Sequence, residues 1–292
     1  MSGFESLSYS QRQRLQFIES VAYWEGMIQR PRVSRVFEVS ENHITRDITW
    51  YRKAFPGSLD YDPSLRAYRP GHKFKPRICT GSPEEYLSLL RTYVESQSVA
   101  VVPSIDQGVT ATCLPMPPGT INKNVLRDVT RALSRRTGIQ VRYQSLSSGD
   151  ASERTIWPHV LVFDGIRWHV RAYDHKRGEF RDFVLQRLLS TASTEEKSPV
   201  SADSDKEWHT FIEAEVVPTR TLGENQRAVI ASQFGMKKEK EGWVWRVQLR
   251  RGIAPYFLAW LRLDLAEEYS FPIALRNKEV FRELKFDKRR GN

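Results

Sequence analysis

The sequence predicts an α+β protein built from several domains. Three observations support this prediction: apolar residues recur at helical spacing before residue 55, the spacing changes to two after residue 139, and strand and helix patterns alternate after residue 210. The chain has 292 residues, of which 40% are hydrophobic, enough for more than one hydrophobic core. We therefore expect five segments: residues 1–75, 76–138, 139–191, 192–209 and 210–292.

The first segment has the pattern of three helices followed by a hairpin. Apolar spacing predicts helices over 11–25 and 41–55, and Pro31 fits the first turn of a short helix between them. Two short extended pieces, SLDYD and RAYRP, then follow each other across a turn. Three helices and a β-hairpin form a winged helix-turn-helix, which places its third helix in the major groove of DNA.

The outward side of the third helix is polar and basic. At 3.6 residues per turn, Asn42, Arg46, Thr49 and Lys53 fall opposite the apolar stripe. We expect the first three to reach base edges, because residues near the start of a recognition helix lie deepest in the groove. Phosphate contacts are expected from Arg52, Lys53, Arg66 and Arg69. A solvated helix face in a small interaction domain would show the same pattern, so this pattern alone leaves DNA binding open.

Residues 76–138 read as a helical connector. Helices are predicted near 83–96 and over 122–137, joined by a proline-rich stretch around 97–121, and Gly138 fits the C-cap of the second helix. Residues 192–209 are rich in Ser, Thr and acidic side chains and poor in large apolar ones, which is typical of a mobile linker.

Composition narrows the class of protein. No run approaches 18 apolar residues and the N-terminus carries no signal pattern, so we expect a cytoplasmic, nucleoid-associated protein with no membrane partner. The net charge of +10 favours polyanions as partners. Cys79 and Cys113 are too few for a disulfide framework or a structural zinc site. The sequence has no nucleotide-binding loop, zinc-hydrolase or serine-hydrolase motif. We therefore expect that the protein is not an enzyme and that it binds neither a cofactor nor a metal.

The middle segment, residues 139–191, predicts four strands separated by turns: IQVRYQSLS, RTIWPHVLVF, RWHVRAYD and EFRDFVLQRLL. In the third strand, His169 and Arg171 point to the face opposite Trp168 and Val170. Around Arg171 we expect further cations without compensating acid, and hydroxyls beside them: Arg154, His159, Arg181, Arg187, Tyr143 and Ser145. Guanidinium groups gathered in this way suit a phosphate-bearing anion. A plain half-exposed sheet explains the same alternation.

Two stretches resemble a known family. RYQSLSS, followed by RTIWPHVLVFDGIRWHVRAYDHKRGEFRDFVLQRL, resembles the WYL domain of bacterial transcription regulators, with Trp168-His169-Val170 in place of the W-Y-L triplet. The opening LQFIESVAYWEGMIQRPRVSRVFEVSENHITRDITWYRKAFPGSLDYD is similar to repressors found upstream of BREX and CBASS phage-defence operons. The resemblance covers nearly the whole chain, although it departs from the family at the second and third letters of the triplet.

This resemblance implies an Sm-like β-barrel over 139–190 with a basic pocket for a nucleic-acid or nucleotide-like ligand. By motif position the pocket would use Tyr143, Ser145, His159, Arg171 and Arg181, with Arg154 and Arg187 beside them. It further implies a homodimer, with residues 210–292 as a C-terminal extension used in dimer contacts.

That last segment also has a pattern of its own. FIEAEVVP and GWVWRVQLR read as strands, ENQRAVIASQFG and PYFLAWLRLDLAEEY as helices, in the order βαβα. The last predicted helix carries more apolar side chains than a helix of its length has to bury: Tyr256, Phe257, Trp260, Leu261 and Leu263. A hidden core and a partner subunit account for them equally well.

The sequence therefore predicts a homodimeric repressor that grips an inverted-repeat operator in double-stranded DNA and responds to an anionic nucleotide or nucleic-acid effector. Two alternatives stay open. One is a module that binds RNA or another single-stranded nucleic acid, because basic, aromatic sheets also bind single strands. The other is a metal-dependent nuclease that would use Asp164, Asp174 and Glu179 near His159 and His169.

Overall fold

The computed structural model describes residues 4, 6–96, 108–117, 119–146, 149–264 and 271–284. It divides into two compact units, an N-terminal unit (Met1–Pro115) and a C-terminal unit (Met116–Asn292). Helices and strands occur in both, which confirms the α+β class. Within the described ranges, no helix combines the length and the apolar character that crossing a membrane requires.

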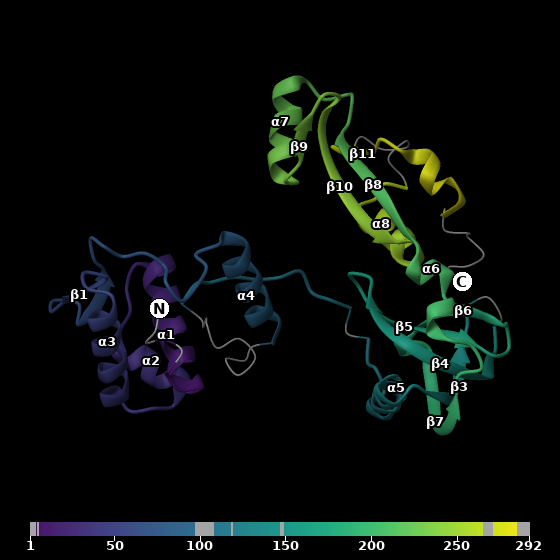
Figure 1. Cartoon of the computed structure of the whole chain (residues 1–292), viewed down its shortest axis with the longest axis horizontal. Helices are drawn as coiled ribbons and strands as arrows, with labels where there is room; N and C mark the ends of the chain where they lie inside the picture. Colours follow the sequence, from purple (N-terminus) through teal and green to yellow (C-terminus); the bar gives the residue numbers. More distant parts are fainter. Residues whose placement is uncertain are drawn as a thin grey trace. The chain divides into compact units, whose positions relative to one another are not determined.

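The N-terminal unit contains the predicted three helices and hairpin (Figure 1). Its elements are α1 (Tyr9–Glu25), α2 (Arg30–Phe37), α3 (Glu41–Ala54), β1 (Leu59–Asp62), β2 (Ala67–Pro70) and α4 (Pro83–Ser96). The apolar stripe of α3 is buried through Ile44, Ile48 and Tyr51, which pack against Leu15 and Ile18 of α1 in one core. β1 and β2 pair antiparallel as a wing. The winged helix-turn-helix is thus confirmed.

Two polar contacts fix α3 and the chain beyond the wing. Arg14 of α1 donates from Nε to Asp47 Oδ2 of α3 at 2.6 Å, and both side chains are largely buried. Glu19 of α1 is fully buried. One of its oxygens accepts three backbone N–H groups, those of Arg77, Ile78 and Cys79, at 2.8, 2.7 and 2.8 Å. The third helix therefore has a fixed orientation, with its polar side outward.

The C-terminal unit begins with a helix on a five-stranded antiparallel sheet (Figure 1). The helix is α5 (Lys123–Arg135), and the strands are β3 (Thr137–Gln144), β4 (Ala151–Phe163), β5 (Trp168–Asp174), β6 (Glu179–Val184) and β7 (Leu188–Lys197), in the order β6-β5-β4-β3-β7. Val125 and Val129 of α5 pack against Val141, Val170 and Ala172 of the sheet. One face of the sheet is therefore the core face.

Two local expectations were wrong in this region. Gly138 does not cap α5: Arg136 takes the left-handed position with φ 56°, and Gly138 lies inside β3. A Cβ on Gly138 would lie 2.7 Å from Trp157 Nε1, so a ring on β4 needs the glycine. Residues 192–209 are not a structureless linker either. Residues up to Lys197 form β7, an edge strand beside β3 whose mostly exposed positions explain its polar composition.

Beyond β7 the chain runs through a connector (residues 198–209), which contains η2 (Ala202–Ser204) and α6 (Lys206–His209). The predicted strand–helix alternation follows in β8 (Phe211–Pro218), α7 (Glu224–Gln233), β9 (Lys237–Glu239), β10 (Gly242–Arg250), η3 (Arg251–Ile253), α8 (Ala254–Trp260), β11 (Ile273–Leu275) and η4 (Lys278–Leu284). These strands form a sheet in the order β11-β8-β10-β9. The expected stretch 97–107 and the later part of the last predicted helix, 265–269, lie outside the described residues.

The apolar residues of the last helix divide into two groups. Phe257, Leu261 and Leu263 pack in the core of this second sheet, so an internal core accounts for them. Trp260 is 62% exposed, and Tyr256 turns toward the first sheet, where its hydroxyl donates to Asp182 Oδ2 at 2.9 Å.

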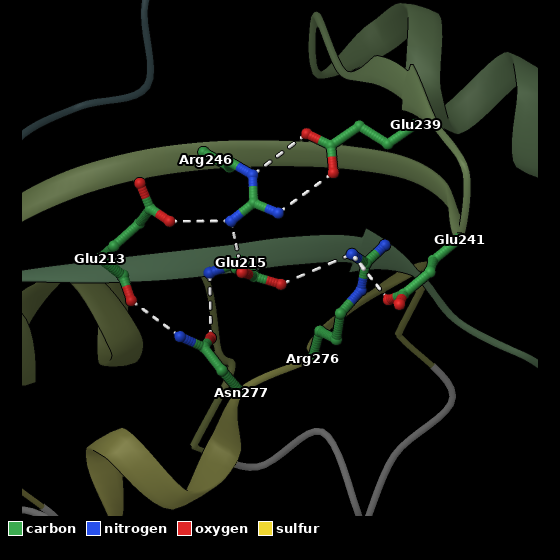
Figure 2. A network of polar contacts seen from close by, with 7 residues as sticks. All are labelled: Glu213, Glu215, Glu239, Glu241, Arg246, Arg276 and Asn277. Carbon is green, nitrogen blue, oxygen red and sulfur yellow. Dashed lines mark hydrogen bonds and ion pairs between the residues drawn. The ribbon is translucent and has the colours of Figure 1, made fainter.

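The outer face of the second sheet carries an ion-pair network. Its members are Glu213, Glu215, Glu239, Glu241, Arg246, Arg276 and Asn277 (Figure 2). Arg246 reaches Glu213 Oε1 at 2.8 Å and Glu239 Oε2 at 3.0 Å, and the amide of Asn277 bonds the backbone of β8. Four carboxylates surround two guanidinium groups, so the charges of Arg246 and Arg276 are already neutralised.

Candidate nucleic-acid interface and ligand site

The side chains predicted to contact DNA all lie on the surface of the N-terminal unit. α3 supplies Asn42, Arg46, Thr49, Arg52 and Lys53, and the wing supplies Arg66 and Arg69, every one of them exposed. Because Ile44, Ile48 and Tyr51 hold the opposite side of α3 in the core, this polar side must face outward. The geometry is that of a recognition helix flanked by a basic wing.

These side chains differ in whether they already form ion pairs or hydrogen bonds within the protein. Among the described residues, Arg46, Lys53 and Arg66 form no ion pair or side-chain hydrogen bond, so their charges are available to a polyanion. Arg52 donates from Nε to the Leu59 carbonyl at 3.0 Å, and Arg69 lies 3.4 Å from Asp62 across the wing. Arg52 and Arg69 therefore also stabilise the wing.

Two further details concern the start of α3. Thr49 donates its hydroxyl to the Thr45 carbonyl at 2.7 Å, which leaves its oxygen as an acceptor only. The Ser40 hydroxyl bonds His43 Nδ1 at 2.9 Å instead of capping the helix backbone. His43 is exposed beside Asn42 and was missed from the sequence, because only one stripe of the helix was considered.

Arg171 of β5 is buried and already paired. It is 5% exposed and donates from Nε to Asp205 Oδ2 at 2.5 Å, from Nη2 to Asp205 Oδ1 at 2.8 Å and from Nη1 to Asp182 Oδ1 at 3.0 Å. The expectation that acid is lacking around Arg171 was therefore wrong. Asp182 lies directly opposite Arg171 in the β5–β6 register, and Asp205 arrives from the connector.

The strand register also separates the arginines. Arg154 pairs with Val141 and Arg181 with Ala172, both core-face residues, so these two arginines lie on the face opposite Arg171. Arg154 donates to Asp174 Oδ2 at 2.5 Å, and Arg181 to Glu179 Oε1 at 2.8 Å. The expected gathering of arginines around Arg171 does not form.

The remaining predicted ligand residues are scattered. Tyr143 is buried in the core, with its ring centroid 5.0 Å from that of Phe183. Ser145 lies half-buried just beyond β3, and Arg187 lies half-buried in η1 (Leu185–Arg187), without an ion pair among the described residues. His159 of β4 lies on the Arg171 side, where its Nε2 is 2.9 Å from Asp205 Oδ2. Of the seven, the structure thus brings His159 and Arg171 together on one face of the sheet, and on the other face the Arg154 guanidinium lies 5.9 Å from the centroid of the Tyr143 ring.

Around this pair the unit builds a buried polar cluster. His169 Nε2 lies 2.7 Å from Asp164 Oδ2, and its ring centroid lies 5.0 Å from that of Tyr256. His169 Nδ1 is buried without a hydrogen-bond partner among the described residues. Three carboxylates, those of Asp164, Asp182 and Asp205, therefore share one guanidinium and two imidazoles.

The cluster shifts the ionisation of its members. Burial alone would raise the pKa of Asp205, but the hydrogen bonds and charge of Arg171 outweigh it, so the pKa lies below its ordinary value. Burial lowers the pKa of His159 and outweighs the opposing effect of the hydrogen bond between its ring and the Asp205 carboxylate. The pKa of Asp164 is also lowered: burial would raise it, and the backbone N–H of Arg167 and the His169 ring outweigh that effect. The pKa shifts therefore favour the charged forms of Asp164 and Asp205 and the neutral form of His159.

The three acids of the nuclease alternative do not meet at one site. Asp174 and Glu179 lie opposite each other in the β5–β6 register, where Asp174 bonds Arg154 and Glu179 bonds Arg181, but Asp164 lies apart from them, hydrogen-bonded to His169. Within the described ranges, no group of three or more His, Cys, Asp or Glu side chains is placed to hold a metal ion.

A pocket of about 400 Å³ lies beside the cluster. It is lined by Leu133, Arg136, Trp157, Pro158, His159, Phe180, Ser198, Val200, Ser201, Ala202, Asp203, Trp208 and His209. Aromatic side chains come from β4, β6 and α6, and His159 joins the pocket to the Asp205 carboxylate. Sequence reasoning missed this pocket and Asp205, because no local pattern indicates that the connector folds back on the sheet.

Three segments of the chain match known families. Residues 10–92 match the BrxR transcriptional regulator winged helix-turn-helix domain, residues 124–192 the WYL domain, and residues 211–281 the BrxR transcriptional regulator C-terminal dimerization domain. The connector lies between the second and third matches.

Curated relatives are similar over nearly the full length. The DNA-binding transcriptional repressor CapW of Escherichia coli (strain KTE188) is 32% identical over 294 residues, covering 97% of this chain and 95% of its own. CapW of Pseudomonas aeruginosa is 33% identical over 293 residues, covering 97% and 94%. A solved structure, proteasome accessory factor B/C (PafBC) of Arthrobacter aurescens, aligns with 91% of this chain and 44% of its own at 17% identity and a TM-score of 0.29. This chain spans less than half of that protein, and the likeness supports no conclusion.

Proposed function

Since the chain belongs to the BrxR and CapW family of DNA-binding transcriptional repressors, we propose that it represses a phage-defence operon by binding an inverted-repeat operator as a homodimer. The observation that carries the proposal is the outward side of α3, where Arg46 and Lys53 stand exposed and unpaired among the described residues. In a twofold dimer, the two recognition helices would enter major grooves one or more turns apart, at about 34 Å per turn.

The roles within the interface follow from position. Asn42, Arg46 and Thr49 lie in the first turns of α3 and would read base edges, with Thr49 as acceptor only. Arg52, Lys53, Arg66 and Arg69 would contact phosphates, which fix the register of the protein on DNA without reading sequence.

The test uses the full-length protein and a duplex selected from a random pool. Arg46→Ala should weaken binding to the selected duplex by roughly 30-fold or more, the equivalent of losing one bidentate base contact of about 1–3 kcal/mol in each copy of the dimer, measured by fluorescence anisotropy. Arg91→Ala, on the exposed surface of α4, is the matched control and should bind like wild type. Equal affinity of the wild type for single-stranded RNA and for the selected duplex would support the RNA-binding alternative instead.

We further propose that the C-terminal unit senses an anionic, nucleotide-like ligand and thereby lowers operator affinity. The predicted ligand residues stay candidates: Tyr143, Ser145, Arg154, His159, Arg171, Arg181 and Arg187. Support comes from the buried guanidinium of Arg171 and from the pocket beside His159. Coupling of this kind is reciprocal, so operator DNA must lower ligand affinity by the same factor that the ligand lowers operator affinity.

A further inference from the structure

The carboxylate that pairs with Arg171 through two hydrogen bonds, that of Asp205, lies outside the sheet to which Arg171 belongs. Asp205 receives two parallel N–H groups from one guanidinium, the arrangement by which arginine holds a carboxylate or a phosphate. Yet Asp205 belongs neither to the sheet of β3–β7 nor to the sheet of β8–β11. It lies in the connector (residues 198–209) between them. A bidentate anion position in the first sheet is thus filled by a side chain from a separate segment.

We propose that Arg171 and His159 form an anion site that Asp205 occupies in the ligand-free protein, and that a phosphodiester monoanion carrying an aromatic base displaces Asp205 from it. This inference rests on the proposed sensing function and names the ligand class and the regulation of that site.

Charge decides which anion fits. One carboxylate leaves when one singly charged phosphodiester enters, so the net charge of the buried cluster is unchanged. A doubly charged phosphate would add a second negative charge beside Asp182 and Asp164, in surroundings where burial makes an unpaired charge costly. The cluster therefore favours a monoanion over a terminal phosphate.

The neighbouring pocket supplies the place for a base. Trp157, Phe180 and Trp208 line it, and rings of this kind bind the faces of nucleobases. Its volume of about 400 Å³ is near the lower end of the ~300–1,000 Å³ typical of small-molecule sites, so it suits one nucleoside and not a strand. His159 borders both the pocket and Asp205, which puts the base next to the phosphodiester.

Displacement of Asp205 has a structural consequence for the following domain. The same carboxylate accepts the Trp208 backbone N–H at 3.2 Å, so it also holds the start of α6. The Trp208 carbonyl accepts from Arg250 Nη1 at 2.7 Å, and that guanidinium lies 4.6 Å from the Trp208 ring. Arg250 ends β10, within the matched dimerization domain. Release of Asp205 therefore loosens α6, the link between the ligand site and that domain.

The experiment compares Asp205→Asn with wild type in full-length protein. The probe is the dinucleoside monophosphate TpT, and binding is measured by isothermal titration calorimetry. Asp205→Asn removes the competing charge while Asp182 still pairs with Arg171, so TpT should bind at least tenfold more tightly than to wild type. Dimethyl phosphate, which has the charge without the base, should show the same preference for the variant at weaker affinity. Glu153→Gln, which removes an exposed charge of β4 outside the pocket, is the matched control and should leave TpT affinity unchanged.

A second measurement needs no substitution. Saturating TpT should speed amide hydrogen exchange at Trp208, His209 and Thr210 in the wild type, because their N–H groups are bonded within the turn that Asp205 holds. Equal TpT affinity of Asp205→Asn and wild type, a gain shared by Glu153→Gln, or unchanged exchange in α6 would each overturn the proposal. If the site behaves as proposed but TpT leaves operator affinity unchanged, the anion site stands and the sensing function fails.

Discussion

Arg171 and Asp205 are joined by two parallel hydrogen bonds of 2.5 and 2.8 Å, although 34 residues separate them in the chain. Replacing Arg171 by Ala leaves the buried carboxylate of Asp205 and the half-buried carboxylate of Asp182 without their cation. Removing one partner of a buried pair commonly costs about 3–5 kcal/mol. We expect Arg171→Ala to lower the free energy of unfolding of the C-terminal unit by that amount, measured by urea denaturation.

The double variant Arg171→Ala with Asp205→Ala serves as the control. Since it removes one of the orphaned charges, it should be more stable than Arg171→Ala alone. Together with Asp205→Ala alone and the wild type, it completes a double-mutant cycle that measures the coupling of the pair. A single variant as stable as wild type would mean that Arg171 contributes nothing to the fold, contrary to its burial.

His159 predicts a pH dependence of stability. Burial lowers its pKa in the folded protein, whereas an unfolded histidine titrates near about 6.5. Between those two values the unfolded chain binds more protons, so stability is lost as the pH falls from about 6.5 toward the folded pKa. The thermal midpoint should therefore drop less for His159→Gln than for wild type between about pH 7.5 and pH 5.5. His72→Gln, on the surface of the N-terminal unit, controls for replacing a histidine. An identical drop in His159→Gln and wild type would refute the prediction.

Local sequence patterns were enough to predict the fold of the N-terminal unit. The buried stripe of α3 and the paired strands of the wing follow from apolar spacing and turn residues, because neighbours in sequence determine both. The outward residues, among them Arg46 and Lys53, follow as the complement of that stripe. Whether they contact DNA depends on a partner and lies beyond any local pattern.

The cluster around Arg171 depends on contacts between distant segments. Alternation along β5 correctly put Arg171 and His169 on one face. It could not show that Asp205 folds back from the connector, nor that Tyr256 arrives from α8. Alternation puts Asp182 on the face opposite Arg181, and the β5–β6 register shows that this is the Arg171 face, so the mistake was to place Arg181 beside Arg171. The later part of β7 was predicted as a linker because its composition is polar, and an edge strand can be polar because it buries little of its surface.

Gly138 offers a test of close packing between β3 and β4. A Cβ there would lie 2.7 Å from Trp157 Nε1 and 2.9 Å from Thr194 Oγ1, and the buried ring cannot move freely. Gly138→Ala should therefore lower the free energy of unfolding by about 1–3 kcal/mol, the usual cost of overpacking. Gly119→Ala is the matched control, because the nearest atom to its Cβ would be Gln186 Cγ at an ordinary 3.5 Å. Equal stabilities of the two variants, measured by chemical denaturation, would show that Trp157 yields.

Lys53 links the DNA interface to the salt dependence of binding. If the dimer neutralises about eight phosphates, operator affinity should fall by about 10³–10⁵-fold between about 50 and 200 mM salt, because bound cations release counterions. Lys53→Ala removes one exposed cation from each copy, so the slope of log affinity against log salt should become shallower by about two. Lys176→Ala, on an exposed turn of the C-terminal unit, should keep the wild-type slope. If Lys53→Ala also keeps that slope, the outer end of α3 does not approach the phosphate backbone, and the proposed orientation of the recognition helix is wrong.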